Sequence, residues 1–172
     1  MDLRSKIRVI EGFPVEGISF KDITTLLKDG KGLRESVEVI CDAVSHLEFD
    51  YVAGIEARGF IFAVPVAYRL GKGFIPVRKP GKLPGNILSK EYDLEYGSNT
   101  IEIDADALKP GDRVLLLDDL LATGGTAKAA IDLINETGAE VVAATFLIEL
   151  EDLKGRDLFS DCETISIVKY DI

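Results

Sequence analysis

Short apolar runs alternate with longer amphipathic stretches along this chain. Apolar runs without polar alternation are typical of strands buried on both faces, and they occur at 51–55, 74–78, 113–118 and 140–148. Between them, apolar residues recur at helical spacing, which predicts helices over 32–46, 60–70 and 125–137. Alternating strands and helices predict an α/β fold with a mostly parallel central sheet flanked by helices.

Residues 79–91 interrupt this alternation. They contain two prolines, two glycines and three lysines, so they are too polar and too rich in turn residues for a buried element. A loop this long in a compact domain commonly has a function, often as a lid, although an idle surface loop is the alternative. Strand-like pieces at 91–96 and 100–103 indicate that the loop belongs to a hairpin-like excursion.

Length and charge narrow the classes of protein that need to be considered. The 172 residues suffice for one domain with a sizeable core, and the formal net charge of −10 argues against binding to nucleic acid or to an anionic membrane surface. We expect no membrane span, because there is no apolar stretch of the required length. The N-terminus lacks an apolar signal core, and Cys41 and Cys162 indicate free thiols, so we expect a cytoplasmic protein.

The most informative segment is 114–126, where a buried strand, two carboxylates and a loop of small residues follow one another. Asp118 and Asp119 come directly after the apolar part of the strand, at the edge where open α/β sheets bind ligands, and they could hold hydroxyls or a metal ion. A loop of small residues then opens the next helix and offers free backbone N–H groups to an anion: Ala122, Thr123, Gly124, Gly125 and Thr126. We therefore expect a ligand with both phosphate and hydroxyl groups, such as a phosphorylated sugar.

Two familiar phosphate-binding motifs do not fit this segment. The P-loop needs a lysine directly before its threonine, whereas Lys128 follows Thr126, and the glycine spacing of the dinucleotide fingerprint is absent. A plain strand, turn and helix with an acidic turn remains the alternative interpretation.

The same segment resembles the phosphoribosyl pyrophosphate-binding motif of the type I phosphoribosyltransferases, most closely in the form found in their adenine-specific members. Further blocks in matching order carry the resemblance from about residue 13 to about residue 155, namely Phe13-Pro14 with Gly17, then 20–23, 54–60, 77–85, 92–97 and 153–156. The resemblance implies a single domain over 1–172. It also implies a small N-terminal hood at about 1–30 and a flexible catalytic loop at about 79–96.

The family's chemistry implies roles for the acidic and basic residues. It implies transfer of the phosphoribosyl group to adenine, which yields AMP and pyrophosphate, with Mg²⁺ as cofactor. Residues 122–126 would hold the 5′-phosphate, and Asp118 and Asp119 would hold the ribose hydroxyls and Mg²⁺, directly or through water. The pyrophosphate end would contact basic side chains, which are Arg58, Arg78, Lys79 and Lys82.

The resemblance also implies catalytic and base-binding residues. Glu95, Arg58 and Tyr96 would be catalytic, with Glu95 managing the proton on the attacking purine nitrogen and Tyr96 ordering the closed loop. The segment Ser19, Phe20 and Lys21 would cover adenine, although the family usually has an arginine in place of Lys21 and an apolar residue in place of Ser19. A homodimer is implied as well.

Arg58 has an independent argument in favour of a ligand role. A cation at the start of a helix is unfavourable beside the positive end of the helix dipole, and a bound anion would remove this conflict. The sole histidine, His46, lies near a helix end and is expected at the surface, so histidine-dependent hydrolysis is not indicated.

Three other functions compete with this interpretation. The same chemistry could act on hypoxanthine, guanine, xanthine or orotate. A regulator could have kept the fold to sense nucleotides, but the chain has no room for an added DNA-reading module and its charge is acidic. A sugar-phosphate-binding protein without catalysis would not need a lid that carries Arg78, Lys82 and Glu95.

Overall fold

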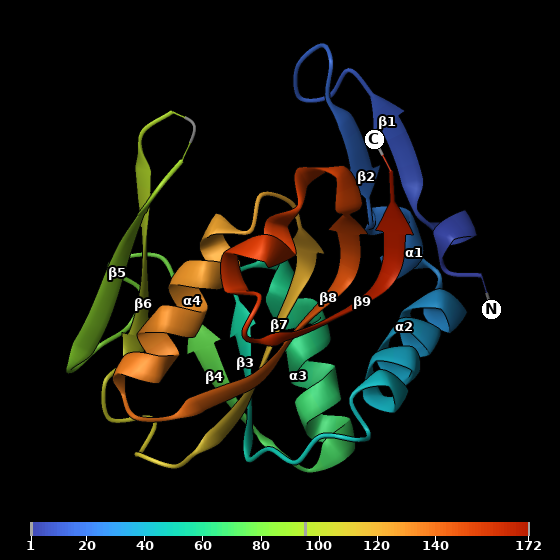
Figure 1. The fold of residues 1–172 in the computed structure, drawn as a ribbon. Coiled ribbons are helices and arrows are strands. Elements are labelled where there is room, and N and C mark those ends of the chain that lie inside the picture. Colours follow the sequence, from blue (N-terminus) through green and yellow to red (C-terminus); the bar gives the residue numbers. More distant parts are fainter. Residues whose placement is uncertain (1, 95, 172) are drawn as a thin grey trace.

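Five parallel strands form the centre of the protein. The computed structural model describes residues 2–94 and 96–171. Figure 1 shows the strands of this sheet pointing in the same direction. The strand order is β4-β3-β7-β8-β9, with every neighbouring pair parallel. These strands are β3 (Tyr51–Ile55), β4 (Gly73–Val77), β7 (Arg113–Leu121), β8 (Glu140–Leu150) and β9 (Glu163–Tyr170). The predicted parallel sheet is confirmed, and each predicted apolar run is one of its strands.

The sheet differs from the prediction at one side and at its carboxyl edge. The last strand, β9, has no predicted counterpart, because only two of its eight side chains are buried and it lacks a continuous apolar run. β7 continues through Asp118 and Asp119 to Leu121, so the two carboxylates belong to the strand itself. Pairing of Leu121 with Glu149 of β8 keeps the chain extended past the apolar residues.

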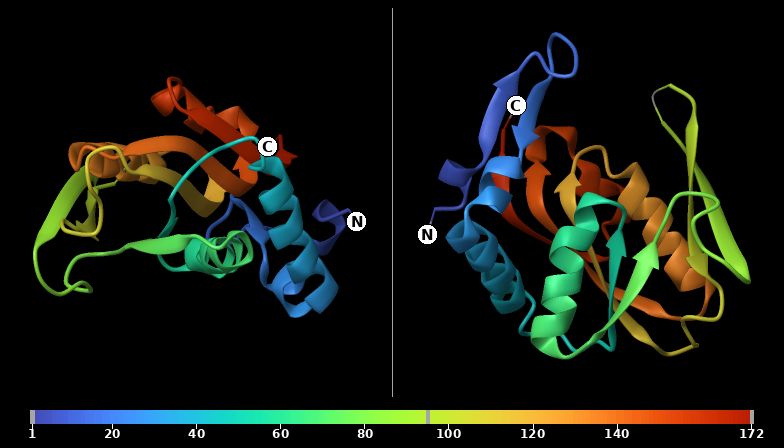
Figure 2. Two further views of the ribbon diagram at one scale, coloured as in Figure 1. Left: turned by 90° about the horizontal axis from the view of Figure 1, so that it is seen from below. Right: turned by 180° about the vertical axis from the view of Figure 1, so that it is seen from behind.

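Helices cover both faces of the sheet (Figure 2). Leu115 and Leu117 of β7 pack into one core with α2 and α3, whereas Val114 and Leu116 pack into a second core with α4. This alternation follows from the twofold repeat of side chains along a strand. The helices are α1 (Thr24–Lys28), α2 (Gly30–Ala43), α3 (Arg58–Leu70) and α4 (Gly125–Glu136). Among the residues described, no helix is long and apolar enough to cross a bilayer.

The direction of winding reverses between β3 and β7. After β3 the chain passes through α3 to β4 on one side, and after β7 it passes through α4 to β8 on the other side. The two helices therefore leave the sheet toward opposite faces, and the carboxyl ends of β3 and β7 border a crevice between them. Open α/β sheets bind their ligands at such a topological switch point.

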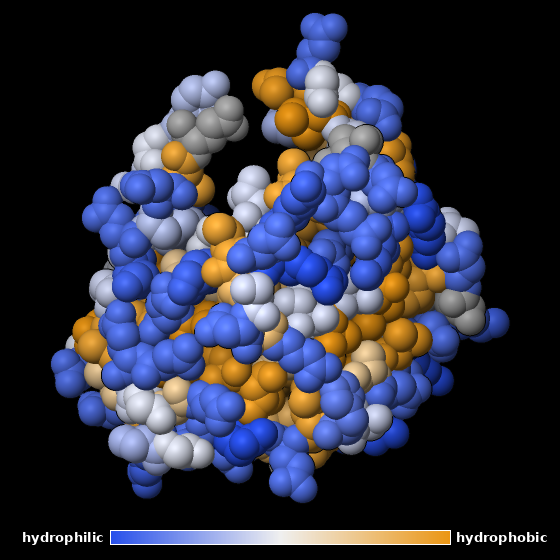
Figure 3. Space-filling view, in the orientation of Figure 1, coloured by the Kyte–Doolittle hydropathy of each residue, from blue (hydrophilic) through white to orange (hydrophobic). Residues whose placement is uncertain are grey.

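Two antiparallel hairpins rise beyond the carboxyl edge of the sheet. β1 (Arg8–Glu11) and β2 (Ser19–Asp22) form the hood hairpin, and β5 (Ile87–Asp93) and β6 (Ser98–Asp104) form the second hairpin. Figure 1 shows them on opposite sides of this edge, and the surface between them is hollowed in Figure 3. The predicted hairpin-like excursion is therefore confirmed. Its predicted boundaries were wrong, because regular pairing with β6 already begins at Ile87 and ends at Asp93.

Short 3₁₀ helices complete the chain. η1 (Arg4–Lys6) precedes the hood, and η2 (Glu151–Leu153) and η3 (Gly155–Phe159) connect β8 with β9. Phe159 is buried against Phe146 of β8, with ring centroids 6.4 Å apart, so this connection is anchored in the core that also contains α4.

Candidate active site

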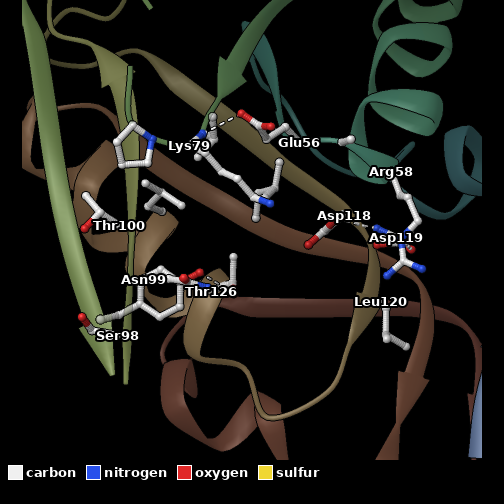
Figure 4. A pocket seen from close by; sticks show the side chains of 16 residues that line it. Glu56, Arg58, Lys79, Ser98, Asn99, Thr100, Asp118, Asp119, Leu120 and Thr126 are labelled. Carbon is white, nitrogen blue, oxygen red and sulfur yellow. Dashed lines mark hydrogen bonds and ion pairs between the residues drawn. The ribbon is translucent and has the colours of Figure 1, made fainter. Parts of the chain in front are cut away.

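A cavity of about 430 Å³ lies at the switch point between β3 and β7 (Figure 4). This volume falls in the range of small-molecule sites. Its walls come from the ends of β3 and β7, the segment after β4, and both strands of the second hairpin. The polar residues that line it are Glu56, Arg58, Lys79, Tyr92, Ser98, Asn99, Thr100, Asp118, Asp119 and Thr126.

The two carboxylates of β7 form the acidic floor of this cavity. Asp119 is only 6% exposed, and its Oδ2 lies 2.9 Å from the Nε of Arg58, while Asp118 Oδ1 accepts a hydrogen bond from the Asp119 N–H. In Figure 4 the Asp118 carboxylate is directed into the cavity, whereas Asp119 faces Arg58. Burial and the neighbouring charge of Asp119 raise the pKa of Asp118 well above its ordinary value. Hydroxyl donors or a cation would relieve this repulsion.

Arg58 reaches the carboxylates because α3 begins directly against β7. A Cβ added at Gly59 would lie 2.8 Å from Asp118 Oδ1, so a larger residue there would push the first turn of α3 away from the strand. Arg58 is the first residue of α3. Its unfavourable position at the helix start is therefore offset by the ion pair with Asp119.

The loop after β7 forms a smaller hollow next to the cavity. The hollow has a volume of about 100 Å³ and is lined by 120–127 together with Asp118. Gly124 precedes α4 with φ of 88°, and the first N–H groups of α4 have no partner within the helix itself. The hollow therefore suits one phosphate group, held by backbone donors and by the positive end of the helix dipole. Asp118, Leu120 and Thr126 line both hollows, which places this candidate phosphate site, the phosphate hollow, beside the acidic floor.

The four predicted basic residues are not equivalent in the structure. Arg58 and Lys79 line the cavity, whereas Arg78 and Lys82 do not belong to its lining. Arg78 Nε lies 3.3 Å from Glu56 Oε1, which also accepts a 2.6 Å hydrogen bond from the Lys79 N–H. Desolvation by burial would raise the pKa of Glu56, but the Lys79 N–H and the Arg78 guanidinium lower it below its ordinary value. Glu56 thus fixes the start of the segment that follows β4.

The predicted base-binding residues lie on the hood hairpin, outside the cavity lining. Lys21 Nζ donates to Ser19 Oγ at 2.7 Å, and the Phe20 ring packs edge-on against Phe13 with centroids 5.1 Å apart. The structure therefore does not bring these three residues into contact with the acidic floor. Their role toward adenine stays a prediction.

Tyr96, one of the two remaining catalytic candidates, lies between β5 and β6 in the second hairpin. Tyr96 is 88% exposed and lies near the phosphate hollow, where both Tyr96 and Thr126 line a shallow groove. Glu95 lies outside the described residues. His46, as expected, is at the surface, where it pairs with Glu163 at 2.8 Å. Cys41 is buried and Cys162 half-buried, and both are free thiols.

Sequence reasoning overlooked several lining residues. Tyr92 stands on β5, and its hydroxyl accepts a 3.0 Å hydrogen bond from Thr126, which joins the hairpin to the start of α4. Asn99 and Thr100 of β6 also line the cavity. Only the packing of the hairpin on α4 places these residues at the site. No local motif marks Asn99 or Thr100, and Tyr92 lies in a block of the family resemblance that assigned it no role.

The donor set suits a hydrated magnesium ion completed by substrate oxygens. No group of three or more metal-ligating side chains exists in the described part of the chain, so a protein-only metal cage is not present there. Mg²⁺ commonly uses one or two carboxylates, water and phosphate oxygens instead. Asp118 and Asp119 offer two carboxylates beside the candidate phosphate site.

Comparison with known proteins agrees with this geometry. The model of the phosphoribosyl transferase domain matches residues 23–172, so the chain belongs to the class of phosphoribosyltransferases. An adenine phosphoribosyltransferase from Clostridium botulinum (strain Alaska E43 / Type E3) is 59% identical over 172 residues, which is 100% of both chains. The protein therefore belongs to the adenine phosphoribosyltransferase family.

Solved structures give the same result. The adenine phosphoribosyltransferase of Thermoanaerobacter pseudethanolicus matches with a TM-score of 0.95 and 49% identity, covering 98% of each chain. The Saccharomyces cerevisiae enzyme, solved with an imino-altritol bisphosphate and adenine, matches with a TM-score of 0.90 and 35% identity over 96% of each chain. The type I phosphoribosyltransferase fold predicted from the sequence is thereby confirmed.

Proposed function

We propose that this chain transfers the 5-phosphoribosyl group of phosphoribosyl pyrophosphate to adenine. Adenine N9 would attack C1 of the sugar as the bond from C1 to the pyrophosphate oxygen breaks, and N9 would lose its proton. The products would be AMP and pyrophosphate. The observation that carries the proposal is the continuous arrangement of acidic floor, phosphate hollow and Arg58 at the switch point between β3 and β7.

The substrate would span the two adjoining hollows. The backbone donors of 122–126 would bind the 5′-phosphate, and Asp118 and Asp119 would accept hydrogen bonds from the ribose hydroxyls. Arg58 and Lys79 line the larger cavity, where the pyrophosphate would lie. Bound Mg²⁺ would neutralise charge on the departing pyrophosphate, with Asp118 and Asp119 as its protein ligands, directly or through water. The protein would contribute mainly positioning and electrostatic stabilisation.

The second hairpin would act as the lid. Its closure would exclude water, which would otherwise hydrolyse the activated sugar. Arg78 and Lys82 would join the pyrophosphate site when the segment after β4 moves with the lid. Glu95 would manage the purine proton, and Tyr96 would lose its high exposure as it orders the closed lid.

The hood would supply the base site. Phe20 would stack on the purine while main-chain groups of Ser19 and Lys21 read its edge. Support comes from the Saccharomyces cerevisiae relative, whose structure contains adenine. We also propose a homodimer, since α3 exposes Ile61, Val64 and Tyr68 on one face. A cytoplasmic location is proposed as well. Sedimentation of the purified protein tests the dimer, and a monomer at micromolar concentration would refute it.

A base-by-base assay with labelled phosphoribosyl pyrophosphate tests the proposed activity. We expect AMP formation in the presence of Mg²⁺, with adenine favoured over hypoxanthine, guanine, xanthine and orotate. A different preferred base would retain the reaction class and refute the base assignment. Binding of the sugar without turnover of any base would indicate a sensor or binding protein.

A further inference from the structure

The phosphate loop is backed by a second piece of main chain. A Cβ added at Gly124 would lie 2.4 Å from the carbonyl oxygen of Gly155, and one added at Gly155 would lie 2.4 Å from that of Ala122. Two glycines therefore let the backbone at the start of η3 lie directly against the loop, with no side chain between them. Any shift of the Gly155 backbone is consequently transmitted to the loop.

An ion pair between a buried carboxylate and a partly exposed arginine fixes this backing segment. Glu149 near the end of β8 is only 2% exposed, and its Oε1 accepts a 2.8 Å hydrogen bond from Arg156 Nε, while Arg156 Nη2 donates to Oε2. Two parallel N–H donors make this a directional contact that holds a guanidinium in one orientation. Arg156 directly follows Gly155, so the pair restrains the glycine that touches the loop.

The backbone of Glu149 also lies beside the other end of the loop. Glu149 is the register partner of Leu121, the last residue of β7 before the loop begins at Ala122. The Glu149–Arg156 pair thus spans from the strand that enters the loop to the segment that backs it.

We propose that Glu149 and Arg156 are positioning residues for the 5′-phosphate. They hold the Gly155 backbone against 122–124 and thereby keep the loop N–H groups directed into the phosphate hollow. Neither side chain lines the cavity or the phosphate hollow, so their effect acts through the loop. This inference rests on the proposed function, because it takes the hollow as the phosphate site.

Calorimetric titration with ribose 5-phosphate and, separately, with pyrophosphate tests the inference. In Arg156→Gln we expect the Kd for ribose 5-phosphate to rise at least tenfold. The Kd for pyrophosphate with Mg²⁺ stays within twofold, because Arg58 and Lys79 are untouched. Arg156→Lys keeps the charge but loses the two-donor contact, so we expect a threefold to tenfold rise. The double variant with Glu149→Gln should be no weaker than Arg156→Gln, since the pair acts as a unit.

Arg8→Gln is the matched control. Arg8 donates from Nε and Nη2 to the buried Asp22 on the hood, far along the chain from the loop. Arg8→Gln removes an ion pair to a buried carboxylate, as Arg156→Gln does, so it should lower the melting temperature. The Kd for ribose 5-phosphate should stay unchanged.

Two results would separate the inference from the proposed function. If wild type binds ribose 5-phosphate and Arg156→Gln binds it equally well, the positioning role is refuted and the function stands. If wild type does not bind ribose 5-phosphate, both are refuted. Should Arg156→Gln fail to fold, Arg156→Lys decides the question by the same Kd.

Discussion

Replacement of Gly124 by alanine places one methyl group at the junction of the phosphate loop and α4. Gly124 has φ of 88°, in the left-handed region that favours glycine, and an added Cβ would lie 2.4 Å from the carbonyl oxygen of Gly155. The obstructing atom belongs to the backbone, so no side-chain rotation can relieve the contact. The loop and the backing segment must therefore separate.

The size of the effect follows from these two observations. The left-handed backbone alone costs alanine about 1–2 kcal/mol. An ordinary contact begins at about 3.4 Å, so relief of the clash needs a displacement of roughly 1 Å, and a misplacement of that size at a binding site can cost about a hundredfold in rate. We expect kcat/KM for phosphoribosyl pyrophosphate to fall about a hundredfold, with a smaller change in KM for adenine.

Gly111→Ala separates the backbone cost from the clash. Gly111 has nearly the same φ, 89°, but an added Cβ meets nothing within 4 Å, and the residue lies before β7 at the far end from the loop. Steady-state kinetics and denaturant unfolding of both variants provide the comparison. Gly111→Ala should lose about 1–2 kcal/mol of stability and keep its kinetic constants. Equal kinetic constants in the two variants would refute the proposed role of the loop.

Three further changes probe other parts of the account. Replacing both Asp118 and Asp119 by Asn should reduce turnover by orders of magnitude, and unchanged steady-state kinetics would count against the acidic floor. Hydrogen bonds from Thr24, and then from Arg8, lower the pKa of Asp22 to about 2 from 3.8. The stability that the ionised Asp22 gives the folded protein is therefore present above about pH 4 and is lost as the pH falls toward 2. Asp22→Asn should therefore lose about 1–3 kcal/mol at pH 7 and converge with wild type near pH 2 in urea titrations, whereas a constant gap would contradict this. Burial raises the pKa of the Cys162 thiol to about 11, so its alkylation at pH 8 should be at least about tenfold slower in folded than in unfolded protein, as mass spectrometry can measure.

The fold was largely predictable because its strands are buried on both faces. Uninterrupted apolar runs at β3, β4, β7 and β8 identify the sheet, and helical spacing identifies α2, α3 and α4. β9 was not predictable in this way, because half-burial leaves it with a mixed sequence. The boundaries of β5 were missed because cross-strand pairing, rather than apolar composition, extends this strand to Ile87.

The site was predictable where it depends on one continuous segment and not where it depends on tertiary contact. The run from Val114 to Thr126 predicts from sequence alone that two carboxylates precede a loop of small residues at the start of a helix, as the structure has them. Tyr92 reaches the cavity only because the hairpin packs on α4, and Gly155 reaches the loop only because η3 folds back over it. No spacing along the chain encodes either contact. Residues 153–156 carry part of the family resemblance, but only the structure shows that the Gly155 backbone lies against the loop.

The central claim is that the loop after β7 binds a ribose phosphate, with backbone amides on the phosphate and the two aspartates on the diol. A crystal structure of the protein with AMP tests it most directly. The account predicts the phosphate within hydrogen-bond distance of the N–H groups of 123–126 and the ribose hydroxyls on Asp118 and Asp119. A well-ordered AMP bound elsewhere, with this loop unliganded, would contradict it.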